Sequence, residues 1–115
     1  MKLREIVNCL AIDLRKLTEY ALNPDNPVGK DKAIVFQNRL GFSKDNYNSL
    51  LEQISHQALD AEVILGRNDQ HGQRYSVDLL IIGTEGQQEI VRTGWIVEPN
   101  RDSARLVTLY VRKRP

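Results

Sequence analysis

The residues with the clearest chemical potential lie in the segment NPDNPVGKDKAIVFQNRLGF, residues 23–42, which holds Lys30 and Lys32 among prolines and glycines. Proline suits the first turn of a helix, so Pro27 predicts a helix entry. Four residues at four-residue spacing then share one face of the helix: Val28, Lys32, Phe36 and Leu40. Lys32 therefore interrupts an apolar stripe.

Two interpretations of Lys32 remain open. Its stem covers apolar surface while its ammonium stays in water, or the helix holds it over a sheet to bind a phosphate. Lys30 and the free amides of the VGKD turn would reinforce a phosphate site, because a helix N-terminus favours anions. Gly29 would leave room for a close approach.

Polar and aromatic side chains also alternate along the extended segments of the C-terminal half. Arg74 and Tyr75 fall on opposite faces of one segment, and Thr93 shares a face with the single tryptophan, Trp95. This alternation is typical of a strand between core and solvent, and a lone tryptophan is typical of a core. Gly94 weakens its strand and predicts a bulge or a close backbone approach.

Templates for metal binding and for nucleophilic catalysis fail. His56 and His71 lie far apart, without carboxylates at ligand spacing, so we expect no metal and no cofactor. Cys9 has no obvious histidine partner. His71 falls in a predicted hairpin turn, where an exposed histidine usually has no role, although its ordinary pKa suits proton transfer near neutrality.

Length and composition predict one domain over residues 1–115 of an ordinary globular chain with a net charge of +1. A single cysteine cannot form an intramolecular disulfide, and neither a signal peptide nor an apolar run of about 20 residues is present. We therefore expect a cytoplasmic protein without a membrane partner. Balanced charge argues against nucleic-acid binding unless the cations are placed asymmetrically.

The C-terminal segment is such an asymmetry. Five cations face one acid there, Asp102, in the last fifteen residues: Arg101, Arg105, Arg112, Lys113 and Arg114. Either this is a solvated edge strand with a frayed basic end, or it is a patch that faces phosphates. An edge strand over residues 103–112 could also pair with a second copy, so a monomer and a homodimer both remain open.

The periodicity predicts an α+β fold. Helical spacing covers residues 14–22, 27–40 and 43–58, with Ser43 as the cap of the third helix and Gly41 as the end of the second. Period-two segments follow at residues 61–66, 73–83, 88–97 and 104–113, joined by short turns. We therefore expect about three N-terminal helices packed on a four-stranded antiparallel meander. Residues 1–12 fit either a short helix or an extended lead-in.

Several stretches resemble a small bacterial family called a domain of unknown function: KLTEYALNPDNPVGKDKAIVFQNRLGF, HGQRYSVDLLI, IVRTGWIV and ARLVTLYV. The resemblance covers residues 12–112. Similar sequences form the C-terminal toxin tips of contact-dependent inhibition systems and other polymorphic toxins. It implies a fold like that of barnase, RelE and colicin nucleases, which cleave RNA without metal through attack of the 2′-hydroxyl on the adjacent phosphate. That chemistry needs a proton acceptor, and cations that stabilise the developing charge.

The resemblance implies catalytic roles at six matched positions: Lys32, Arg74, Tyr75, Thr93, Arg105 and Thr108. Substrate contacts would come from three more: Lys30, His71 and Trp95. In one coherent assignment, Lys32 and an arginine clamp the phosphate, Tyr75 or His71 handles the proton, and a threonine orients the substrate. Asn26 departs from the pattern, because family members often have a histidine before the proline.

Two classes of function follow. One is a metal-independent ribonuclease, the toxin half of a toxin–immunity pair, with RNA and an immunity or antitoxin protein as partners. The other is a non-catalytic binding module that uses the same scaffold and acts through a protein partner, since a fold alone does not transfer activity. Convergence of the predicted catalytic side chains in one exposed site would favour the enzyme.

Overall fold

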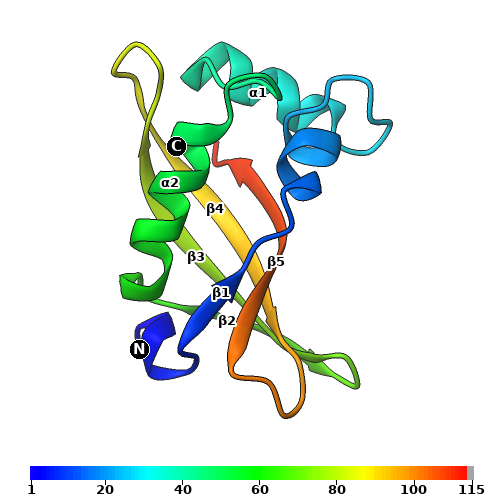
Figure 1. The fold of residues 1–115 in the computed structure, drawn as a ribbon, viewed down its shortest axis with the longest axis vertical. Helices are drawn as coiled ribbons and strands as arrows, with labels where there is room; N and C mark the ends of the chain where they lie inside the picture. Colours follow the sequence, from blue (N-terminus) through cyan, green and yellow to red (C-terminus); the bar gives the residue numbers. More distant parts are fainter. Residues whose placement is uncertain (114–115) are drawn as a thin grey trace.

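The computed structural model describes residues 1–113 and contains a five-stranded sheet covered by helices (Figure 1). The strands lie in the order β1 (Cys9–Ala11), β5 (Ser103–Val111), β4 (Gln88–Val97), β3 (Gly72–Ile82) and β2 (Ile64–Asp69). The helical elements are η1 (Leu3–Glu5), η2 (Lys16–Ala21), α1 (Lys30–Leu40), α2 (Asn48–Gln57) and η3 (Ala58–Asp60). The α+β class is as expected from the sequence.

The predicted four-stranded sheet is wrong by one strand. β2 to β5 form the expected antiparallel meander, but β1 adds to β5 in parallel, from Cys9 opposite Ser103 to Ala11 opposite Arg105. The charge pattern of β5 suggested a lone edge strand, and this expectation is wrong because β1 pairs with its first residues. A strand of three residues is too short to show a period of two, so residues 1–12 gave no strand signal.

The helices follow the predicted pattern with three differences. α1 begins at Lys30 rather than at Pro27, because Pro27 to Gly29 form a turn. α1 ends at Gly41, whose φ of 77° is the left-handed conformation of a glycine cap, as predicted. The first predicted helix is a short π-helix, η2. The third helix begins at Asn48 rather than at Ser43, because Ser43 belongs to a turn in which its N–H donates to Asn46 Oδ1 at 2.6 Å.

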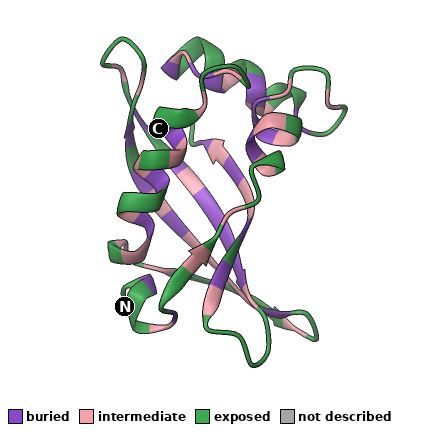
Figure 2. Cartoon of the chain, in the orientation of Figure 1, coloured by how far each residue is buried: buried purple, intermediate pink, exposed green. Residues whose placement is uncertain are grey.

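The sheet has two unlike faces. One face packs against the helices and forms the core with Trp95, Val77 and Leu109, all fully buried. Figure 2 shows the buried residues running along the strands and along the sides of the helices that face them. No helix within residues 1–113 has the length and apolar character needed to cross a membrane.

The opposite face, called the outer face below, is defined by strand register. Three rows of residues run across β3, β4 and β5: Asp78–Arg92–Tyr110, Ser76–Gly94–Thr108 and Arg74–Ile96–Arg105. The register shifts between Gly94 and Trp95, and a Cβ on Gly94 would lie 2.8 Å from Thr108 Cγ2. The predicted bulge is therefore present opposite Gly94, with its extra residue, Val107, in β5, whereas the close neighbour of Gly94 is a side chain and not backbone.

Candidate functional site

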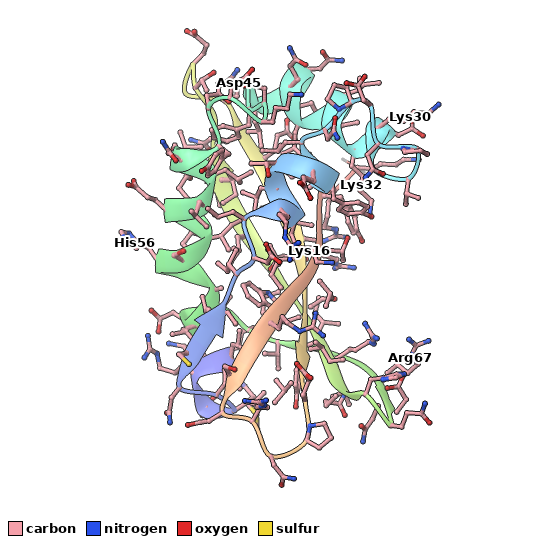
Figure 3. The ribbon with its side chains drawn as sticks, turned by 45° about the vertical axis from the view of Figure 1, so that its right-hand side comes forward. Lys16, Lys30, Lys32, Asp45, His56 and Arg67 are labelled. Atoms are coloured by element: carbon pink, nitrogen blue, oxygen red, sulfur yellow. The ribbon has the colours of Figure 1, made fainter. Side chains whose placement is uncertain are left out.

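The Lys32 side chain lies in a cluster built by η2, α1 and β5. Its Nζ donates to Tyr20 Oη at 2.7 Å and to Thr108 Oγ1 at 3.2 Å. The same Nζ lies 5.0 Å from the centre of the Tyr20 ring and 5.5 Å from that of Tyr110. In Figure 3, Lys32 lies beside the upper part of β5, whereas Lys30 projects away from the molecule. We call Tyr20, Lys32, Thr108 and Tyr110 the lysine cluster.

The charge of Lys32 is not neutralised inside the lysine cluster. Its polar partners are two hydroxyl oxygens, and within residues 1–113 it forms no ion pair with a carboxylate. Aromatic rings on two sides attract the cation without cancelling its charge. The ammonium therefore keeps the capacity to bind an anion.

The turn before α1 packs against Tyr20, and its backbone amides bond within the turn instead of pointing at an anion. Asn26 Oδ1 accepts the N–H groups of Val28 and Gly29, both at 2.9 Å, and Asn26 O accepts that of Lys30 at 2.9 Å. Three of the four amides expected to be free, those of Val28, Gly29 and Lys30, are therefore already bonded to Asn26. Gly29 is required for a different close approach, since a Cβ there would lie 2.3 Å from Tyr20 O.

Lys32 also changes the acidity of its neighbour. The hydrogen bond that the Lys32 ammonium donates lowers the pKa of the Tyr20 phenol, with a smaller contribution from Thr108. A cation next to a phenol favours the phenolate. Tyr20 therefore has a larger phenolate fraction than a free tyrosine at the same pH.

An ion cluster borders the lysine cluster in the next row of the outer face. Arg92 holds Asp78 through two bonds, Nε to Oδ1 at 2.8 Å and Nη2 to Oδ2 at 3.0 Å, and Arg112 Nη1 reaches Oδ2 at 2.9 Å. The Arg92 hydrogen bonds lower the pKa of Asp78, and Asp78, followed by Tyr110, raises the pKa of Arg92. Two cations share one carboxylate here, which leaves positive charge next to Tyr110.

Arg74 and Arg105, expected in the phosphate clamp, lie in the row beyond Thr108. They flank Ile96, which is only 2% exposed although it points away from the core cluster, so their stems cover it. Arg105 Nε pairs with Glu98 Oε1 at 3.2 Å. Arg74 has no ion pair among the described residues, and its Nε is buried without a hydrogen-bond partner.

The other predicted residues lie away from the lysine cluster. Thr93 and Trp95 are fully buried on the core face, where the indole Nε1 donates to Thr93 Oγ1 at 2.8 Å and Oγ1 donates to Val77 O. Tyr75 shares that face, in register with Trp95. His71 lies in the β2–β3 turn, at the opposite end of the molecule from α1 (Figure 1). Of the nine predicted residues, only Lys32 and Thr108 therefore belong to the lysine cluster.

Sequence reasoning missed Tyr20 and Arg92. Tyr20 lies twelve residues before Lys32, a spacing that carries no signal until the intervening turn is known. The pairing of Arg92 could have been predicted from sequence. The TEG turn pairs Ile82 with Gln88, and the same register places Arg92 opposite Asp78. Opposite charges at directly paired positions are a recognised cross-strand signal.

Within residues 1–113, no three His, Cys, Asp or Glu side chains gather closely enough to hold a metal ion.

Comparison with known proteins places the chain in a family. A model described as "Domain of unknown function (DUF6883)" matches residues 2–113. The chain belongs to the DUF6883 family. This confirms the resemblance to a domain of unknown function, and the DUF6883 match includes both the lysine cluster and the ion cluster. No curated protein matches the sequence of this DUF6883 chain significantly.

A solved structure shares the fold of this DUF6883 chain. It is a chain of a structure described as a contact-dependent growth inhibition toxin–immunity protein complex from Klebsiella pneumoniae 342. The TM-score is 0.70 with 18% sequence identity, and the match covers 89% of this chain and 99% of that chain. At that identity the similarity shows a common fold with one chain of that complex.

Proposed function

We propose that this DUF6883 chain is a ribonuclease whose reacting phosphate binds at the lysine cluster. The observation that carries the proposal is the Lys32 ammonium, unneutralised by any carboxylate in the described residues, held between Tyr20 Oη and Thr108 Oγ1. The cluster places a cation for a phosphate and a phenol of lowered pKa within one hydrogen bond of each other. These are the two components that 2′-hydroxyl attack requires.

The proposed reaction is a transesterification that needs no added reactant. The Tyr20 phenolate accepts the proton of the ribose 2′-hydroxyl, and the 2′-oxygen forms a bond to the adjacent phosphorus. The bond from phosphorus to the 5′-oxygen breaks, and that oxygen takes a proton from water. The hydroxide left behind takes the proton held by Tyr20, which restores the phenolate and the water. Lys32 stabilises the additional negative charge on the phosphate, and Thr108 Oγ1 orients a phosphate oxygen. The products carry a 2′,3′-cyclic phosphate and a 5′-hydroxyl.

The charge distribution supports an RNA substrate. The chain carries a net charge of only +1. The lysine cluster and the rows beside it nevertheless bring five cations to the outer face, against the carboxylates of Asp78 and Glu98: Lys32, Arg74, Arg92, Arg105 and Arg112. A basic surface on a nearly neutral chain is the asymmetry expected of a nucleic-acid binder. The common fold with a chain of a toxin–immunity complex is consistent with a toxin role.

The test is cleavage of total tRNA and of a labelled single-stranded RNA in the presence of EDTA. We expect the wild-type chain to cut both, and an oligonucleotide with 2′-deoxyribose at the cut site to resist. Lys32→Ala should lower kcat/KM by about 10²- to 10³-fold, the usual cost of removing a group that stabilises a developing oxyanion. Arg4→Ala removes an exposed cation that pairs with Asp60 at 2.6 Å, outside the lysine cluster and the outer face, so it is the matched control and should cut at close to the wild-type rate.

Two results would overturn the proposal. One is intact RNA in every sample, with circular dichroism showing that all the proteins are folded. The other is equal cleavage of the 2′-deoxy oligonucleotide, since an oligonucleotide without the hydroxyl cannot follow this reaction. Mass spectrometry of the fragments identifies the cyclic phosphate independently of the rate.

A surface beside the site favours a second candidate, the binding of a protein partner without catalysis. Leu80 and Ile90 are paired across β3 and β4 on the outer face and are 47% and 39% exposed, and Ile82 nearby is 39% exposed. Exposed apolar groups bordered by charges are typical of protein–protein contacts. Two kinds of partner could bind this surface. One is an immunity protein that covers an active site, and the other is a partner of a domain without catalytic activity. The cleavage assay separates the two functions.

A further inference from the structure

A small cavity lies next to the lysine cluster, between the start of α1 and the end of β5. Its volume is about 250 Å³, and its lining consists of Asp31, Lys32, Val35, Tyr110 and Val111. Drug-sized ligands occupy pockets of about 300–1,000 Å³. The cavity is shallow and open to solvent, and its volume is enough to hold a single ring system.

The walls of the cavity suit a nucleobase. Tyr110 supplies an aromatic ring and the two valines supply apolar contacts. Proteins bind unpaired bases by stacking them on aromatic side chains, at about 1–3 kcal/mol per base. Lys32 belongs both to the cavity and to the lysine cluster. One nucleotide can thus place its phosphate at the Lys32 ammonium and its base against Tyr110.

Asp31 gives this cavity a carboxylate, which prefers ligands that donate N–H hydrogen bonds. Its carboxylate forms no ion pair and no hydrogen bond with the described residues, and it lies one residue from the cation that would hold the phosphate. A carboxylate repels phosphate but accepts hydrogen bonds from N–H groups, two at a time where the donors are adjacent. Guanine offers two adjacent donors, its ring N–H and its amino group. Adenine and cytosine offer an amino group, and uracil offers only a ring N–H.

We infer that the cavity between α1 and β5 is a nucleobase subsite in which Tyr110 stacks the base and Asp31 selects bases that carry an amino group, guanine above the others. The inference rests on the proposed ribonuclease function, because it assigns the base of the nucleotide whose phosphate binds at Lys32. It makes Asp31 a specificity-determining residue of that site.

The experiment measures the binding of guanosine, adenosine, cytidine and uridine 3′-monophosphates to the full chain by isothermal titration calorimetry. We expect the guanosine nucleotide to bind about 10- to 100-fold more tightly than the uridine nucleotide, the usual discrimination of a bidentate contact to a base. Asp31→Asn should remove most of that preference. Asp45→Asn, an equal charge change in a turn away from Lys32 (Figure 3), should retain it.

Equal binding of the four nucleotides, absence of binding, or an unchanged preference in Asp31→Asn would each overturn the inference. Asp31 also favours the N-terminus of α1 electrostatically, so circular dichroism must show that the variant keeps its helices. Cleavage of RNA without base preference would preserve the ribonuclease and remove the subsite. Guanosine preference without cleavage would preserve the subsite and remove the ribonuclease.

Discussion

At the scale of single residues, Lys32 shows why a lysine on an apolar helix face is ambiguous from sequence. Its stem shares a face with Phe36 and Leu40, which are fully buried, so half of the structural interpretation holds. Its ammonium, however, is not solvated by water alone, since it donates hydrogen bonds to Tyr20 Oη and Thr108 Oγ1. Residue spacing gives the direction of a side chain and leaves the atoms at its end unknown.

Tyr20 makes the reaction depend on pH. Its pKa is lowered by the Lys32 hydrogen bond, and a phenol accepts a proton only above its pKa, so kcat/KM should rise as the pH increases toward that value. The rise should level off below about pH 10, the ordinary pKa of tyrosine. Tyr20→Phe should lower kcat/KM by about 10²- to 10⁴-fold and abolish the rise. A pH–rate profile with a fixed RNA substrate measures both effects.

Tyr75→Phe is the control for this prediction, because Tyr75 lies on the core face of β3 in register with Trp95. It should keep the wild-type profile. If the rise with pH persisted in Tyr20→Phe, another group would be the base, and the assignment of Tyr20 would be wrong.

At the scale of elements, the turn of residues 23–29 positions the site. Asn26 closes it through the N–H groups of Val28 and Gly29 and donates from Nδ2 to Glu19 O at 2.9 Å, which joins the turn to η2. Asn26 therefore holds the backbone of the turn. The density of prolines and glycines thus serves to place Tyr20 against Lys32.

Gly29→Ala tests the packing of this turn. A Cβ at this position would lie 2.3 Å from Tyr20 O and 3.2 Å from Tyr20 Cδ1, so either the turn or Tyr20 must move. We expect the free energy of unfolding to fall by about 1–3 kcal/mol, as for other overpacked sites. Urea denaturation measures this change. Val28→Ala alters the neighbouring residue, which is 75% exposed, and should change stability by less than about 0.5 kcal/mol. Equal stability of the two variants would contradict the packing argument.

The strands and α1 could be predicted from sequence, whereas the site could not. A period of two and short turns sufficed for β3 to β5, and Gly41 sufficed for the end of α1. β2 was expected at residues 61–66 but lies at Ile64–Asp69, because part of the expected turn is paired strand. β1 was missed because three residues carry no period, and its partner lies more than ninety residues away. Thr93 and Trp95 belong to a block that carried the family resemblance, yet they are buried and bonded to each other in the core, so the block did not separate packing from chemistry.

At the scale of the whole molecule, the distribution of charge matters more than its sum. The net charge of +1 counted against a nucleic-acid binder. Folding places Arg74 and Arg92 on the same face as Arg105 and Arg112, although these pairs come from different parts of the chain. The sequence showed only the C-terminal half of this surface, because the other half depends on strand register.

The N-terminal segment packs into the core and adds a strand beside β5, so it should be essential for the stability of the fold. Leu3 and Val7 are 0% and 1% exposed, and β1 pairs with β5, so residues that looked like a lead-in belong to the core. Leu3→Ala should lower the free energy of unfolding by about 2–5 kcal/mol, through lost burial and the cavity left behind. Chemical denaturation compares it with Leu14→Ala, whose side chain is 43% exposed and which should lose less than about 1 kcal/mol. Equal losses would mean that the N-terminal segment is not packed in solution, and that β5 has a free edge along Ser103–Arg105.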